Sequence, residues 1–141
     1  MKIKLEGGKI RIPEETIEEF AKKKGIDLRC KIEEEGVKID LEREFFGFEV
    51  PVHIFIPEIA YENFILKIKN FKVMVSSMVI PYISIIPFIK KYHFLALDME
   101  NKVLNINLKD FIPKYLSFKI EKILAKSAEI EIEINELTIS L

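Results

Sequence analysis

Apolar and polar residues alternate with a period of two along most of the chain, a pattern typical of β-strands with one buried and one solvated face. The clearest case is 129–134, where glutamates occupy the odd positions and isoleucines the even ones. The same alternation on both sides of Glu34-Glu35-Gly36 predicts a hairpin of 28–33 with 37–41. Further strands are expected at 2–12, 48–56, 64–69, 94–99, 103–108 and 116–120.

Two of these strands carry a signal for a local break. Gly7-Gly8 interrupts the strand expected over 2–12, and such a pair marks a tight turn or a bulge. After Asn135-Glu136 the apolar positions of the last strand change from even to odd, to Leu137 and Ile139. A β-bulge at this point would keep all the apolar side chains of the strand on one face.

The signals change to those of a helix at Pro13. Proline suits the first position of a helix, and glutamates follow it where the helix dipole is positive. Three lysines precede Gly25, which is typical of a helix end. The apolar face of this helix, with Ile17, Phe20 and Ala21, is narrow, so the helix can cover a sheet on one side.

One long apolar segment, Val73 to Ile89, interrupts the regular pattern. Its 17 residues carry no charge, whereas 32% of the chain is Asp, Glu, Lys or Arg, and lysines flank the segment on both sides. Serines able to cap a helix precede apolar residues at helical spacing. The segment is therefore expected to form a helix that is apolar all round, kinked by Pro87.

Three surroundings would suit such a helix: the protein core, a bound apolar ligand, or a bilayer. A membrane span needs about 20 apolar residues, and this segment is shorter and contains two prolines. A spanning helix is therefore disfavoured. A core helix packed under the sheet and a helix that lines an apolar groove both stay open.

The expected fold class is α+β. A strongly curved, mostly antiparallel meander sheet would wrap around the apolar central helix, with one further helix near the N-terminus. At 141 residues the chain is long enough for a substantial core. The expectation is a single domain over 1–141.

Composition excludes some classes of partner and location. The chain has 22 basic and 23 acidic side chains, with the basic ones scattered, so nucleic acid is not an expected partner. A single cysteine excludes an internal disulfide, and no signal peptide is recognisable, so the chain is expected in the cytoplasm or at the periphery of a membrane. Abundant Lys and Glu, with no Gln, suggest a thermophilic source.

Candidate catalytic chemistry is sparse. The soft metal ligands are His53, His93 and Cys30, and no pair of them has a metal-binding spacing. Cys30 lies on the apolar side of its strand, which indicates a buried small hydrophobe rather than a nucleophile. His53 is interpreted as a hydrogen-bonded histidine of the core or of a groove. No metal, no cofactor and no enzymatic activity are expected.

The order of elements resembles that of small bacterial lipid-binding proteins of the LmeA type, and of the related TULIP and BPI-like domains. The resemblance rests on the apolar central segment and on a C-terminal run of sequence patterns. These are Val103-x-Asn105-x-Asn107-Leu108, Phe111-Ile112-Pro113 and Phe118-x-Ile120-x-x-Ile123. It implies a curved sheet around a long helix, with an apolar groove that accepts acyl chains.

The function expected from the sequence is non-enzymatic binding of a lipid or other apolar small molecule between the sheet and the central helix. The flanking lysines favour an additional peripheral contact with anionic membranes. The residues predicted to line the groove are Phe48, Val52, Ile54, Met74, Met78, Tyr82, Ile85, Ile86 and Phe94. The alternative is a structural or protein-interaction module that buries the same apolar surface in a homodimer or against a partner.

Overall fold

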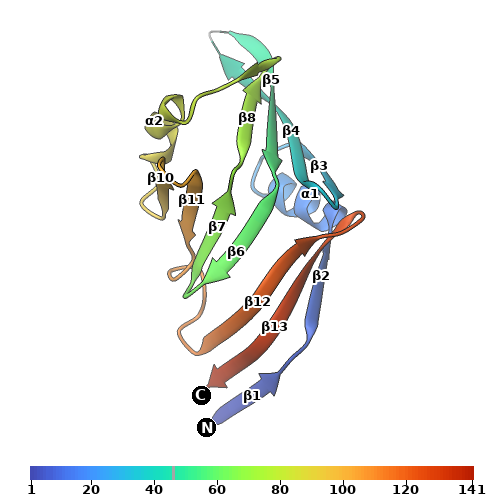
Figure 1. The fold of residues 1–141 in the computed structure, drawn as a ribbon, viewed down its shortest axis with the longest axis vertical. Helices are drawn as coiled ribbons and strands as arrows, with labels where there is room; N and C mark the ends of the chain where they lie inside the picture. The colour runs from blue at the N-terminus through green and yellow to red at the C-terminus, as the bar shows by residue number, and fades with distance from the viewer. Residues whose placement is uncertain (46) are drawn as a thin grey trace.

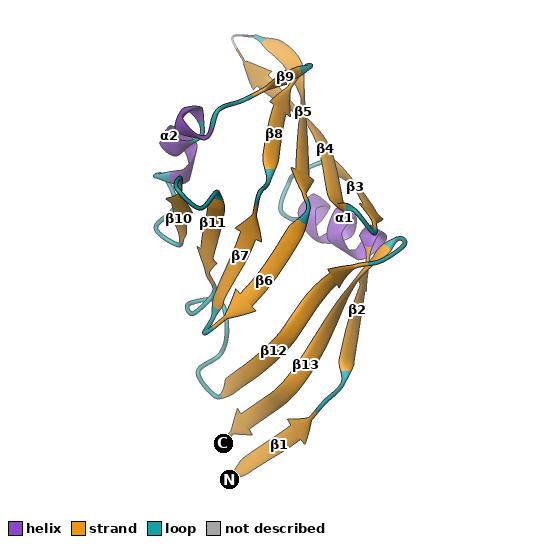
Figure 2. Ribbon diagram, in the orientation of Figure 1, coloured by secondary structure: helices purple, strands orange, loops and turns teal. Residues whose placement is uncertain are grey.

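The computed structural model describes residues 1–45 and 47–141. The described chain is a mostly-β protein built from three antiparallel sheets and two short helices, and it is elongated, with both termini at one end (Figure 1). Both helices lie in connections between one sheet and another (Figure 2).

The first sheet, here called the terminal sheet, contains both ends of the chain. Its strands are β1 (Lys2–Glu6), β2 (Lys9–Pro13), β12 (Leu116–Ala125) and β13 (Glu129–Ser140). The long β13 pairs with β12 on one side and with β1 and then β2 on the other.

Both breaks expected in the terminal sheet are confirmed, and they lie opposite each other. The register between β12 and β13 shifts where Lys119 pairs with Glu136 and Ile120 with Ile134, so Asn135 is the extra residue of a bulge. Across from it the Gly7 amide donates to the Asn135 carbonyl at 2.9 Å. The glycines therefore let the edge strand bend where β13 bulges.

The second sheet, the middle sheet, has the strand order β10-β11-β7-β6. Its strands are β6 (Glu58–Glu62), β7 (Ile65–Lys69), β10 (Leu95–Asp98) and β11 (Val103–Asn107). The hairpin of β10 with β11 and the strand β7 are confirmed, whereas β6 lies where the sequence pattern predicted no strand. β6 meets the terminal sheet through Tyr61, whose ring stacks on Phe118 with centroids 5.1 Å apart.

The third sheet has five strands in the order β3-β4-β5-β8-β9. These are β3 (Leu28–Glu33), β4 (Gly36–Phe45), β5 (Phe48–Ile56), β8 (Lys72–Val75) and β9 (Met78–Val79). The expected hairpin of β3 with β4 is confirmed. Gly36 follows its turn with φ +147°, which brings the chain against the backbone of Ile56.

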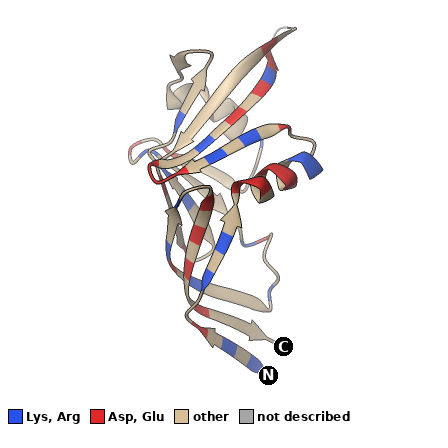
Figure 3. Ribbon diagram, turned by 90° about the vertical axis from the view of Figure 1, so that its right-hand side faces the viewer, with Lys and Arg blue, Asp and Glu red and all other residues tan. Residues whose placement is uncertain are grey.

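Helix α1 (Glu14–Lys23), confirmed with its acidic start and basic end (Figure 3), lies along the edge of β3. The Glu18 carboxylate accepts from the Cys30 amide at 3.0 Å, and the Glu14 carboxylate accepts from the Ile32 amide at 2.9 Å. At the same edge, the Ala128 amide donates to the Ile32 carbonyl. The helix and the β12–β13 turn thus satisfy backbone groups that an exposed edge strand would leave open.

The core is small and lies where the elements around β3 meet. Its centre is Cys30, Ile32 and Val37, with Ile17 of α1 and Ile130 of β13 packed against them. On the solvated face of the terminal sheet, the Glu131 side chain is 9% exposed and lies 3.7 Å from Arg11 and 3.9 Å from Lys9. The alternation of isoleucine and glutamate therefore separates an apolar face from a face of cross-strand ion pairs, as the sequence indicated.

The expected fold class is wrong. Among the residues that the structure describes, no sheet is strongly curled and no long helix lies inside one. The segment 73–89 instead forms the end of β8, the short β9, a 3₁₀ turn (Tyr82–Ser84) and the four-residue helix α2 (Ile86–Ile89). Pro81 and Pro87 lack the backbone donors that a continuous helix needs, and β8 and β9 gain sheet hydrogen bonds in its place.

Candidate functional site

The segment 78–92, here called the apolar strap, connects the five-stranded sheet to the middle sheet. It runs through β9, the 3₁₀ turn and α2 along one side of the molecule (Figure 1). In the residues Val73 to Ile89, which the sequence predicts to be enclosed, Ile89 is the one buried side chain. The most apolar stretch of the sequence therefore lies mostly at the surface.

Aromatic contacts hold the strap at two points. The Tyr82 ring stacks on Phe71, which is buried, and the Tyr82 hydroxyl donates to the Phe71 carbonyl. Burial raises the pKa of Tyr82 above its ordinary value. At the other end Tyr92 contacts Phe94, whose ring meets Phe111 edge-on with centroids 5.1 Å apart. The path of the strap is therefore fixed even though most of its side chains are not covered.

Five large apolar side chains of the strap project into solvent. Their exposed fractions range from 51% to 69%. They are Met78, Val79, Ile83, Phe88 and Tyr92. Single exposed apolar residues are ordinary on protein surfaces, but a run of them within one segment indicates an interaction surface.

Exposed lysines accompany this apolar surface. Lys72 precedes the strap, while Lys90 and Lys91 lie near its end, and within 1–45 and 47–141 none of the three forms an ion pair. The Lys91 ammonium lies 5.4 Å from the centroid of the Phe88 ring. The strap thus presents apolar side chains together with positive charges that no carboxylate of the described chain neutralises.

A hollow of about 310 Å³ lies where the start of the strap meets the end of the middle sheet. Phe71, Val79, Ile80 and Tyr82 give it an apolar lining, and Lys102 contributes a cation. Its volume is at the lower limit of small-molecule sites. It is an open depression, so a ligand there would stay partly in solvent.

The predicted lining residues do not gather around one groove. Val52 and Ile54 lie on the inner face of β5, where Val52 pairs with Val75 and is buried. Met74 pairs with His53 and therefore belongs to the opposite, solvated face. Phe48 is 73% exposed at the start of β5. The central helix that was expected to close a groove over these residues does not form, because 73–89 folds as strands and short helical turns.

The remaining predicted residues belong to the strap or follow it. Met78 and Tyr82 occupy its first half, and Ile85 and Ile86, both partly buried, precede and begin α2. Phe94 lies beyond the strap. The structure therefore brings four of the nine predicted residues into one segment, on a surface rather than in an enclosed groove.

Sequence reasoning missed the residues that give the strap its exposed face. Ile83 and Phe88 lie within the predicted helix but were not chosen as ligand contacts, and Tyr92 was not considered. The signal that could have found them is the proline pair. A segment that cannot form a continuous helix has no regular apolar face to bury, so part of its apolar side chains must stay outside.

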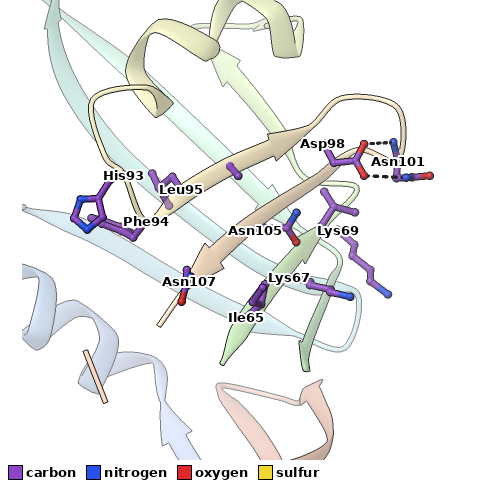
Figure 4. Close-up of a pocket in the computed structure, with 12 residues that line it drawn as sticks. Ile65, Lys67, Lys69, His93, Phe94, Leu95, Asp98, Asn101, Asn105 and Asn107 are labelled. Atoms are coloured by element: carbon purple, nitrogen blue, oxygen red, sulfur yellow. Dashed lines mark hydrogen bonds between the residues drawn. The ribbon is translucent and has the colours of Figure 1, made fainter. Parts of the chain in front are cut away.

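A second hollow, of about 560 Å³, lies over the solvated face of the middle sheet (Figure 4). Lys67 and Asn105 are cross-strand partners there, and Phe94 lies at one end. Asp98 accepts hydrogen bonds from the backbone and side chain of Asn101, which lower the pKa of Asp98. The lining mixes charged and amide side chains with apolar ones such as Ile65, Leu95 and Val103, so this hollow is not an apolar groove.

The candidate metal ligands do not form a metal-binding cluster in the described part of the chain. The His53 ring and the Asp40 carboxylate are 2.6 Å apart, but both are about half exposed on the charged face, so His53 is hydrogen-bonded as expected yet lies outside the core. No group of three or more His, Cys, Asp or Glu side chains in 1–45 and 47–141 could hold a metal ion. Cys30 is buried as predicted, and burial, with Glu14 and Glu18 nearby, raises its pKa to about 11.

No helix in the described part of the chain has the length and apolar character needed to cross a bilayer. Comparison of the chain with protein-family models, with curated protein sequences and with solved structures gives no match. The functional argument therefore rests on the exposed surfaces and the chemistry of their side chains.

Proposed function

We propose that this protein binds, without catalysing a reaction, to anionic lipid surfaces through the apolar strap. The observation that carries the proposal is the exposure of Ile83 and Phe88 next to Lys90 and Lys91. Apolar side chains flanked by cations are the composition of segments that lie in the interface of a membrane. The lipid-binding role expected from the sequence is kept, but the site is an outer surface rather than an enclosed groove.

The energies of such a contact favour reversible binding. Burying one large apolar side chain in the acyl region contributes roughly 1.5–3 kcal/mol, and a lysine near a charged headgroup layer contributes about 1 kcal/mol. The combined binding free energy of four side chains would exceed the contribution of any one of them. These are Ile83, Phe88, Lys90 and Lys91. The contribution of the lysines should weaken as salt is added.

Co-sedimentation with vesicles tests this proposal. Vesicles of phosphatidylcholine mixed with phosphatidylserine should bind the protein, and vesicles of phosphatidylcholine alone should bind it less. The double variant Ile83→Ser/Phe88→Ser should lose binding to both. The double variant Lys90→Glu/Lys91→Glu should lose the preference for phosphatidylserine.

Met99→Ser is a matched control, because Met99 is 45% exposed and lies outside the strap. It should bind like the unaltered protein. Equal binding of all variants, or no binding of the unaltered protein to either vesicle, would contradict the proposal.

A second function, self-association, is favoured by a separate observation. The accessible surface of the chain is 10,166 Å², whereas a compact monomer of its mass would expose about 7,600 Å². The excess is roughly a third, and fifteen large apolar residues of the described chain are exposed. A chain with so much surface relative to its core gains stability when a partner covers part of it.

A further inference from the structure

We infer that two copies of this chain pair through the free edges of β1, which join in antiparallel orientation about a two-fold axis. The inference rests on the edge of the terminal sheet and not on the apolar strap, so it stands or falls independently of lipid binding. The partner it commits to is a second copy, and the interface would extend the terminal sheet from one molecule into the next.

The hydrogen bonds within the terminal sheet determine which backbone groups of β1 are free. Met1 and Leu141 exchange two hydrogen bonds, of 2.9 and 2.8 Å, and the Gly7 amide donates to Asn135. Paired and unpaired residues alternate along an antiparallel strand. The backbone amides and carbonyls of the odd residues of β1 therefore point toward β13. Those of the even residues point away from the sheet.

The even residues of β1 are Lys2, Lys4 and Glu6, all exposed. In a symmetric antiparallel pair, the register that uses all three places Lys4 opposite its own copy and Lys2 opposite Glu6 of the second molecule. This register follows from the alternation of free backbone groups, and it produces two identical ion pairs related by the two-fold axis.

The side chains also suit this register. Lysine on an edge strand usually discourages pairing, but here the order Lys, Lys, Glu is complementary to itself when reversed. The two central Lys4 ammonium groups would repel each other, and each has Glu136 of its own chain 4.0 Å away to offset that repulsion. On the opposite face, Ile3 of one copy would lie beside Leu5 of the other.

Burial of apolar side chains on the other face of the sheet would stabilise this pairing. Ile3 is 42% exposed and Leu5 is 55% exposed, although their cross-strand neighbours Ile139 and Leu137 are partly covered. Pairing would continue this apolar face across the axis.

Two other strand edges are less suitable for pairing of this kind. At the free edge of β3, backbone amides already donate hydrogen bonds to the Glu14 and Glu18 carboxylates. The edge strand β9 has two residues, Met78 and Val79, and offers little ladder to a partner. β1 has five residues, and its outer edge carries no other strand.

Exchange of charge at the two ends of β1 tests the register. In Lys2→Glu, two glutamates would face each other at both of the symmetric 2–6 contacts, and in Glu6→Lys two lysines would do so. Each variant alone should therefore be monomeric by size-exclusion chromatography with light scattering. When the two variants are mixed, both ion pairs are restored and a heterodimer should form. The double variant Lys2→Glu/Glu6→Lys should form a homodimer like the unaltered chain.

All of these positions are exposed, so circular dichroism and melting temperature should stay unchanged and exclude misfolding as the cause. The inference is overturned if the unaltered chain is monomeric at high concentration, if either single variant dimerises as well as the unaltered chain, or if the mixture fails to form heterodimers. Vesicle binding by the strap would survive each of these outcomes.

Discussion

The ring of Tyr82 stacks on the ring of Phe71 with their centroids 4.8 Å apart and 19° between their planes, and the Tyr82 hydroxyl donates to the Phe71 carbonyl. This pair joins the apolar strap to the end of the middle sheet. Phe71 is 4% exposed, so Tyr82 attaches the strap to the interior between the exposed residues Val79 and Ile83.

Removing this attachment should loosen the strap without unfolding the protein. Tyr82→Phe deletes one hydrogen bond and should lower the free energy of unfolding by about 1 kcal/mol. Tyr82→Ala also removes the stacked ring and should cost about 3 kcal/mol. Hydrogen exchange should accelerate at the amides of Ile85, Phe88 and Ile89, which lie within the strap.

Tyr115→Ala is the control for this pair, because Tyr115 is 53% exposed. Its unfolding free energy should change by less than about 0.5 kcal/mol. Unchanged exchange in the strap of Tyr82→Ala would show that Tyr82 does not hold it.

The carboxylate of Glu14 should matter through the backbone of β3. Glu14→Ala leaves the amide of Ile32 without its acceptor in a place where Ile32 is 2% exposed, so a loss of about 1–3 kcal/mol is expected from urea unfolding. Glu14→Gln keeps an acceptor oxygen and should lose less. Glu15→Ala is the control, because Glu15 lies on the same turn of α1 but makes no such bond, and it should leave the free energy of unfolding nearly unchanged. Equal losses of stability for Glu14→Ala and Glu15→Ala would contradict this role of Glu14.

The Cys30 thiol should give the protein a stability that falls in alkaline solution. Its pKa is raised from 9.0 to about 11 in the folded chain, so above pH 9 the unfolded chain loses this proton first. The contribution is therefore complete below pH 9 and is lost as the pH rises through 11. Buried and protonated, the thiol should also react slowly with iodoacetamide until the protein unfolds.

Cys30→Ala isolates this effect, since the ionisation of tyrosines and lysines is common to both proteins. The difference in unfolding free energy between the unaltered chain and Cys30→Ala should shrink between pH 9 and 11. A difference that is constant across this interval would show that the thiol pKa is not raised by folding.

Gly36 should tolerate no side chain. A Cβ at this position would lie 2.3 Å from the Ile56 carbonyl oxygen and 2.8 Å from the Pro57 Cα, and neither backbone atom can move away easily. Gly36→Ala should therefore cost about 3 kcal/mol. Gly25→Ala is the control, because Gly25 has φ +81° and open space around the Cβ; it should lower the free energy of unfolding by about 1 kcal/mol from backbone strain alone. Similar losses of stability at both sites would contradict the steric explanation.

The local pattern of the sequence was sufficient for most of the strands. Alternation and turn residues identified the β3–β4 hairpin and α1, and the change of phase after Asn135 located the bulge of β13. These features depend on neighbours within a few residues, so the period of the side chains and the preferences of glycine and proline determine them. The segment 58–62 was missed because its own residues give no clear strand pattern. It forms a strand because it pairs with β7.

What the sequence by itself determined is that this chain forms antiparallel strands with one aliphatic and one charged face, an N-terminal helix with an acidic start and a basic end, and a buried Cys30. What the tertiary structure alone decided is how the strands divide into three sheets and whether Val73 to Ile89 lies inside or outside. Hydropathy reports that a segment avoids water, but coverage depends on which other elements can reach it. Because Pro81 and Pro87 prevent a continuous helix and no sheet curls around the segment, its side chains form a surface instead of a core.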